Sequence, residues 1–217
     1  MLTWITSQGG FTSIEFESAI AKAYVLATKY GEASASLSAL MYDAMAEASG
    51  ANVASAVVAE TATLGEVSKA IYGGATFSQS DEYISGIVGR LVKQAGADTT
   101  LQNAKRDGAQ FAWIASGDTC AYCELISSIG WQYASSNTIK GNHADHIHAN
   151  CDCQFMIRFD NESSVGGYEP NTSLYDSLEG NTLEQKVNTL RRQEYAENKD
   201  EINEQKRIAY AKRTEDE

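Results

Sequence analysis

All four cysteines and all three histidines of this 217-residue chain lie in one continuous segment that starts at Cys120 and ends at Cys153. Cys120 and Cys123 form a C-x2-C pair, and His148, Cys151 and Cys153 form the sequence H-x2-C-x-C. Two such short spacings let one metal ion take two ligands from each of two turns, which is the usual way to complete a tetrahedral zinc site. The segment therefore predicts a metal-stapled module.

Five ligand candidates are available for about four positions. The preferred zinc set is Cys120, Cys123, His148 and either Cys151 or Cys153, and an all-cysteine site is the next choice. Paired cysteines in a chain without an export signal favour metal binding over disulfides. Reduced thiols, or two disulfides under oxidising conditions, are the other two interpretations.

The zinc is expected to be structural. Residues 134–150 are poor in apolar side chains, and a bound metal contributes folding free energy directly where packing is weak. His143 and His146 are weaker ligand candidates, which we expect to face solvent or to support the ligands. A closed four-ligand site leaves no open position for an activated water. No catalytic residue is assigned.

Three kinds of catalytic site are alternatives to a structural zinc. A redox dithiol normally lies at a helix start after a strand in a βαβ unit, which this sequence does not indicate. A nuclease of the histidine–metal finger type needs a further downstream ligand, and no histidine follows His148. A metal-dependent hydrolase, whether a protease or a nuclease, would need an open metal position near Asp118, Asp145 or His146. It remains the alternative function.

The composition predicts a mainly α-helical chain. It has a single proline, Pro170, and is rich in Ala, Ser and Glu, which favours long helices. The predicted fold class is mainly α with a small α+β zinc-knuckle-like module and a long charged C-terminal helix. The predicted units are a helical body over 1–96, the Cys/His module over 97–178, and the charged helix over 179–217.

Hydrophobic spacing predicts the individual elements. Helices are expected over 16–48, 51–74, 80–93 and 99–116, with Thr99 or Thr100 as the N-cap of the fourth, and short strands over 130–135 and 153–159. Residues 182–213 are expected to form one helix with few apolar contacts, which projects from the body or self-associates.

Net charge is −12, and the C-terminal residues 181–217 carry 8 basic and 9 acidic side chains. Because no segment has a basic excess, direct nucleic-acid binding is disfavoured. The chain has no run of about 18 apolar residues and no export signal. We therefore expect a soluble, non-secreted protein with no membrane contact.

Several motifs resemble the minor head (minor capsid) proteins of tailed bacteriophages, the group described as Mu F-like. The similarity lies in the upstream AKRDG, in Gly117-Asp118-Thr119-Cys120-x2-Cys123, in His148-x2-Cys151-x-Cys153 followed by an apolar strand, and in the later Gly-Tyr-x-Pro. It is strongest over residues 97–178 and weaker over 14–95. The middle motif of the family is richer in small residues and Arg than SSIGWQ is here.

The resemblance implies a low-copy virion protein of the phage head, made in the host cytoplasm. Its expected partners are the portal protein, the major capsid protein, or both, during head assembly. Some relatives are labelled capsid maturation proteases, but this sequence holds no Ser-His-Asp or Cys-His arrangement of that kind. The resemblance therefore favours a structural function.

Overall fold

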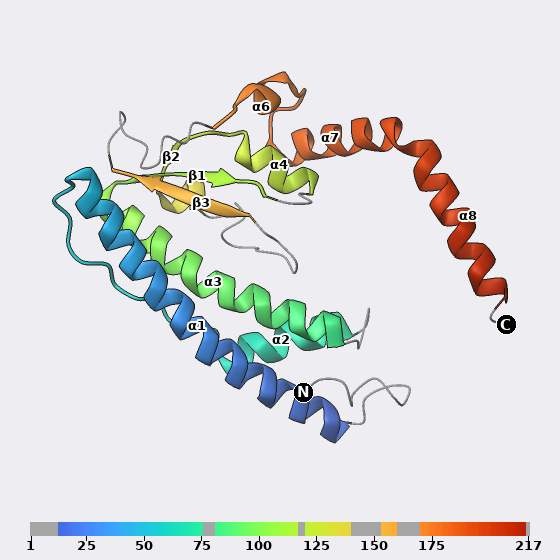
Figure 1. The fold of residues 1–217 in the computed structure, drawn as a ribbon, viewed down its shortest axis with the longest axis horizontal. Coiled ribbons are helices and arrows are strands. Elements are labelled where there is room, and N and C mark those ends of the chain that lie inside the picture. The colour runs from blue at the N-terminus through green and yellow to red at the C-terminus, as the bar shows by residue number, and fades with distance from the viewer. Residues whose placement is uncertain (1–12, 76–80, 117–119, 140–152, 160–169, 216–217) are drawn as a thin grey trace.

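The computed structural model describes residues 13–75, 81–116, 120–139, 153–159 and 170–215. It is mainly helical, with a small sheet beside the ends of two long helices and a helical arm on the far side (Figure 1). Within the described residues, no helix is both long and apolar enough to cross a bilayer. The elements in chain order are α1 (Ser13–Ser49), α2 (Leu64–Ala75), α3 (Asp81–Asp107), β1 (Gln110–Ile114), α4 (Ala121–Ser127), β2 (Gln132–Tyr133), α5 (Ser136–Ile139), β3 (Gln154–Arg158), α6 (Ser173–Ser177), α7 (Leu183–Glu197) and α8 (Lys199–Glu215).

Helices α1 and α3 lie side by side and run in the same direction (Figure 1). Small side chains line their contact, among them the buried Ala27, Ala35 and Ala95. A Cβ at Gly96 would lie only 2.7 Å from the Ser34 Oγ and 2.8 Å from the Ser38 Oγ, so a larger residue there would have to displace these two side chains. Because the helices are parallel, the chain between them has to return along the whole body.

Residues 51–63, here called the strap, make most of this return. A helix was predicted over 51–74. The prediction is confirmed for α2 but is wrong for the strap, which has no regular secondary structure. A capping box explains where α2 begins: the Thr63 N–H donates to Glu66 Oε2 at 2.7 Å, and the Glu66 N–H donates back to Thr63 Oγ1 at 3.3 Å. The Thr63 N–H and the Thr63 hydroxyl, which donates to Glu66 Oε2 at 2.9 Å, both lower the pKa of the Glu66 carboxyl group.

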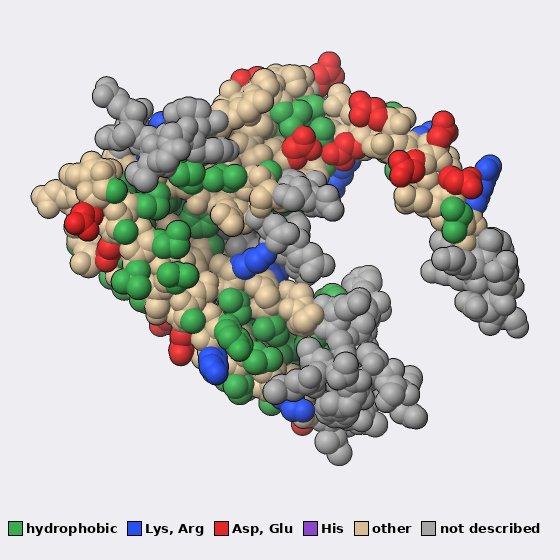
Figure 2. Space-filling view, in the orientation of Figure 1, with side chains coloured by type: hydrophobic (Ala, Val, Ile, Leu, Met, Phe, Trp, Pro, Cys, Tyr) green, Lys and Arg blue, Asp and Glu red, His purple; other side chains and the backbone are tan. Residues whose placement is uncertain are grey.

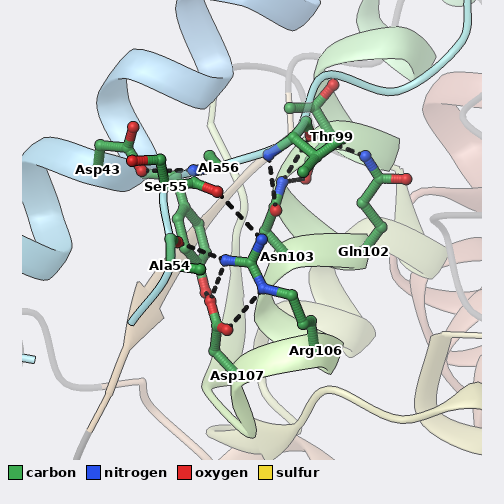
Figure 3. A network of polar contacts seen from close by, with 11 residues as sticks. Asp43, Ala54, Ser55, Ala56, Thr99, Gln102, Asn103, Arg106 and Asp107 are labelled. Atoms are coloured by element: carbon green, nitrogen blue, oxygen red, sulfur yellow. Dashed lines mark hydrogen bonds and ion pairs between the residues drawn. The ribbon is translucent and has the colours of Figure 1, made fainter. Parts of the chain in front are cut away.

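Side chains of α3 satisfy the backbone of the strap (Figure 3). The Val57 N–H donates to Asn103 Oδ1 at 2.9 Å, and Asn103 Nδ2 donates to the Val57 carbonyl at 2.8 Å. The Ala59 N–H donates to Thr99 Oγ1 at 3.0 Å. Asn103 and Thr99 are fully buried. The side-chain amide of Asn103 thus satisfies both backbone hydrogen-bonding groups of Val57, as a neighbouring strand would. These groups therefore do not need helical hydrogen bonds.

The boundary between α3 and β1 differs from the prediction in two ways. The expected break after residue 93 is absent, and the Thr99 hydroxyl does not cap a new helix but donates to the Ala95 carbonyl at 2.8 Å inside α3. The helix ends at Gly108, whose φ of +68° suits glycine, and the strand β1 follows. The helix crosses the predicted 96/97 unit boundary without a break; the division into three units stays a prediction.

The sheet is antiparallel, in the order β2-β1-β3. Its register pairs Phe111 with Ile157 and Trp113 with Phe155. The buried Phe111, Trp113 and Ile157 share one core with Tyr42 of α1, so the sheet packs on the C-terminal ends of the long helices. The predicted strands GWQYAS and CQFMIRF are confirmed as β2 and β3, whereas β1 lies in the part of the chain predicted as a fourth helix.

The C-terminal segment forms two helices instead of the predicted one. Val187 and Leu190 of α7 are buried against Leu125 of α4 and Leu178, which fixes α7 on the module. The break comes at Asn198, the C-cap of α7, whose N–H donates to the Glu194 carbonyl at 3.0 Å. Beyond it, α8 extends away from the body, as Figure 1 shows.

Candidate metal centre

Cys120 and Cys123 lie at the start of α4. Cys120 is the N-cap residue, with extended backbone (φ −72°, ψ 155°), and its carbonyl accepts the Glu124 N–H at 2.9 Å. Its side chain is exposed, whereas Cys123, one turn later, is only 1% exposed. The C-x2-C pair therefore runs from the surface into the interior across a single helical turn.

Cys153 is brought to the same place by the sheet. It immediately precedes β3, and the register pairs Gln154 at the start of β3 with Ile114 at the end of β1. The chain leaving β1 leads directly to Cys120, so antiparallel pairing places the residue before β3 beside the segment that carries the C-x2-C pair. Cys153 accordingly packs on a small cluster that contains Cys123, although the two are thirty positions apart in the sequence.

Apolar side chains surround this contact. Ala97 of α3 is buried with Cys123, and Phe155 packs on the same cluster. The ring of Phe155 also meets the buried Trp113 edge to face, with 5.2 Å between centroids. Burial against a packed aromatic core limits the access of solvent to the sulfur atom of Cys123, as in an inert structural cysteine.

Tyr122 connects the cysteines to the arm. Its half-buried ring packs on the sheet core and also on the α4–α7 cluster. Burial raises the pKa of Tyr122, and negative charge on Cys123 and Cys120 raises it further. Tyr122 is therefore close enough to both cysteine side chains to be affected by their charge.

Three of the five predicted ligands are described, namely Cys120, Cys123 and Cys153, and of these Cys153 packs on the cluster that contains Cys123. His148 and Cys151 lie outside the described residues, as do His143, His146, Asp118 and Asp145. In the described part of the chain, no group of three or more His, Cys, Asp or Glu side chains is arranged to hold a metal ion. The donor chemistry fits zinc, and the full ligand set stays a prediction.

A sizeable recess lies elsewhere, between the strap, α2 and α3. It encloses about 700 Å³, and the charged side chains of Glu60, Lys69, Arg90 and Asp98 are among those that line it. Neither α4 nor β3 contributes to its walls. The cysteines are therefore not part of this recess, which agrees with a packed, structural position.

Sequence reasoning missed the residues that hold the strap, shown in Figure 3. Arg106 donates to the carbonyls of Ala54 at 2.6 Å and Ser55 at 3.1 Å, and pairs with Asp107 at 2.7 Å. The nearly buried Asp107 also accepts the Tyr42 hydroxyl at 2.8 Å. Burial and this carboxylate raise the pKa of Tyr42. Arg106 and Asp107 belong to the AKRDG motif. The sequence drew attention to this motif but did not indicate its structural role.

A comparison with protein families adds an independent finding. The model of the family described as VG15 protein matches residues 4–177, which include the helical body and the Cys/His segment. VG15 is a viral, phage-gene family, so the match supports a phage protein. Comparisons with curated proteins and with solved structures each give no match.

Proposed function

We propose, from the premise that this chain belongs to the VG15 protein family, that it is a structural protein of the phage head. In this proposal it acts during head assembly, next to the portal or the inner capsid surface. Two features support the proposal: the family match over most of the chain, and the resemblance of the Cys/His motifs to Mu F-like minor head proteins. The α7–α8 arm offers a long surface for contacts with neighbouring virion proteins.

We further propose that the module holds a structural zinc ion through Cys120, Cys123, His148 and one of Cys151 and Cys153. The observation that supports this proposal is that Cys153 packs on the small cluster formed by Ala97 and Cys123, so that one residue of the C-x-C motif lies on the same cluster as one residue of the C-x2-C pair. When bound, zinc supplies a cross-link between α4 and the strand β3. The protein's own part is to present the thiols from a helical turn and a strand end that the sheet keeps together.

The test is metal content followed by chelation. Purified protein is expected to hold about one zinc per chain, and its removal should increase hydrogen exchange in residues 117–160 while α1 and α3 stay protected. His148→Ala should reduce bound zinc sharply, whereas the matched control His143→Ala should retain it. A chain without metal, or one that loses metal with no change in exchange, contradicts the zinc proposal.

The variants Cys151→Ser and Cys153→Ser separate the two candidate ligands. We expect the larger loss of zinc affinity for Cys153→Ser, because Cys153 packs on the cluster that contains Cys123. A larger loss of zinc affinity for Cys151→Ser would identify Cys151 as the fourth ligand. Equal zinc retention in both variants would remove the C-x-C motif from the site.

The placement in the head is tested separately, by mass spectrometry of purified virions. Detection at low copy number agrees with the proposal, and absence from the particle contradicts it. His146→Ala addresses the alternative of a metal-dependent hydrolase. Normal head maturation with this variant removes that alternative, while arrested maturation with an intact fold would replace the structural function.

A further inference from the structure

Helix α1 carries a regular apolar stripe on the side turned away from α3. Its members, here called the α1 outer stripe, are Tyr30, Ala33, Leu37, Leu40 and Ala44. All five are exposed; Leu37 is 59% and Leu40 is 68% exposed. Figure 2 shows hydrophobic side chains gathered along α1.

The stripe is not needed for the fold of the chain itself. The opposite side of α1, through residues such as Ala27, Ala35 and Ala39, already packs into the interior. Leucines in a continuous exposed row are unfavourable in water, and such patches on a folded protein usually mark a contact surface. The stripe therefore points to an intermolecular contact.

The spacing of the stripe identifies the shape of the partner. Successive members are separated by three, four, three and four residues, from Tyr30 to Ala33, Leu37, Leu40 and Ala44. This is the heptad repeat of a coiled-coil seam, which fits a second α-helix lying nearly along α1. A flat or irregular partner would not need this period.

Charges beside the stripe identify the partner further. One flank carries the exposed Lys22 and Lys29 toward the N-terminus of α1 and the exposed Glu47 toward its C-terminus, where the half-buried Asp43 accepts the Ala56 N–H of the strap. A second α1 that runs antiparallel brings the basic end of one flank against the acidic end of the other. The side chains then alternate in size, because Leu37 faces Ala33 of the second copy and Tyr30 faces Leu40.

We propose that two copies of this chain associate antiparallel through the α1 outer stripe. The inference uses only α1 and does not depend on the zinc site or on the function in the phage head. It also differs from self-association through the C-terminal helix, which the sparse apolar residues of α8 had suggested.

The first test is sedimentation equilibrium of the full chain over a range of concentrations. A dimer is expected in the micromolar range, and Leu37→Lys should raise its dissociation constant at least about a hundredfold, because a charge would be buried without a partner. The matched control is Ile208→Lys, an equally exposed apolar residue on α8 (51% exposed), which should leave the dimer unchanged. Circular dichroism checks that both variants fold.

The second test addresses orientation by charge reversal. Lys22→Glu and Glu47→Lys should each raise the dissociation constant by about three- to tenfold, and the double variant should restore it. A wild-type chain that stays monomeric at about 100 µM overturns the proposal. A dimer lost in Ile208→Lys but kept in Leu37→Lys also overturns it, as does a double reversal that fails to restore binding.

Discussion

At the scale of single residues, a few polar side chains decide where the strap lies. Asn103 bonds both the N–H and the carbonyl of Val57, and Thr99 receives the N–H of Ala59. Buried polar groups of this kind are costly when they lose their partners. Sequence alone could not assign these roles, because Asn and Thr inside a helix are ordinary residues and their partners here lie forty or more positions away.

Replacing Asn103 by leucine, which has a similar volume, should destabilise the protein by about 2–3 kcal/mol. The variant leaves Val57 without its paired amide and also loses the bond from Asn103 to the Thr99 carbonyl. Gln102→Leu is the control, since Gln102 bonds the same Val57 carbonyl from an exposed position and should cost less than about 1 kcal/mol. Urea unfolding measures both; equal effects would contradict the role of Asn103.

Asp107 should make stability depend on pH. The Arg106 side chain lowers the pKa of Asp107 below its usual 3.8, and the Tyr42 hydroxyl lowers it further. A lowered native pKa gives stability that is fully present above about 3.8 and is lost as pH falls toward the native value. Wild type should therefore exceed Asp107→Asn in unfolding free energy at pH 7, and the difference should shrink below pH 4.

The control for this pH effect is Glu204→Gln, an exposed carboxylate on α8. Its difference from wild type should be small at every pH, since exposed ion pairs contribute little. A gap between wild type and Asp107→Asn that stays constant from pH 7 to pH 3 would show that proton binding by Asp107 is not coupled to folding.

The cysteines show both the strength and the limit of residue-level reasoning. Spacing alone predicted that the C-x2-C pair and the C-x-C motif share one metal site, and in the structure Cys153 packs on the cluster of Ala97 and Cys123. The burial of Cys123 was not predictable, because it depends on Ala97 and Phe155, which belong to other elements. Metal binding itself stays a prediction.

At the scale of elements, helix periodicity was informative for long regular segments and misleading at their ends. The helix predicted over 16–48 agrees with α1, which continues through Gly31 without a break. The predicted fourth helix joined the end of α3 to β1, because QFAWI is equally compatible with a buried helix or strand. The Asp107-Gly108 pair was the local signal for the change.

The contact between α1 and α3 gives a prediction at this scale. Gly96→Val should lower the free energy of unfolding by about 1–3 kcal/mol, because the new side chain has to displace Ser34 and Ser38. Gly89→Val, on the same helix, is the matched control, since a Cβ there meets nothing within 4 Å. It should be neutral or slightly stabilising. A similar loss in both variants would mean that backbone propensity, not close packing, explains the effect.

At the scale of the whole molecule, stability is concentrated in the body and the module. One core joins α1, α2 and α3, a second lies under the sheet, and a third fixes α7 on α4. The described residues of α8 are almost all exposed. The arm therefore contributes surface rather than core, which is consistent with contacts to other proteins.

Removal of residues 199–217 should change the free energy of unfolding by less than about 0.5 kcal/mol. Leu190→Ala, in the buried part of α7, should instead cost about 2–4 kcal/mol. Denaturant titration followed by circular dichroism compares the two. If the truncation destabilises as much as Leu190→Ala, α8 has intramolecular contacts that its exposure does not indicate.

The sequence by itself determined the helical class, the two short strands in GWQYAS and CQFMIRF, and the concentration of metal-ligating residues in one segment. These features are local, because periodicity, propensity and ligand spacing act over a few residues. The tertiary structure decided the extended strap, the unbroken α3 and the strand β1. Each depends on partners far away in the chain. The strap depends on polar side chains that take the place of a neighbouring strand, α3 on a glycine that lets a second helix approach, and β1 on the strands that pair with it. Such partners exist only once the chain has folded, so local pattern alone cannot specify them.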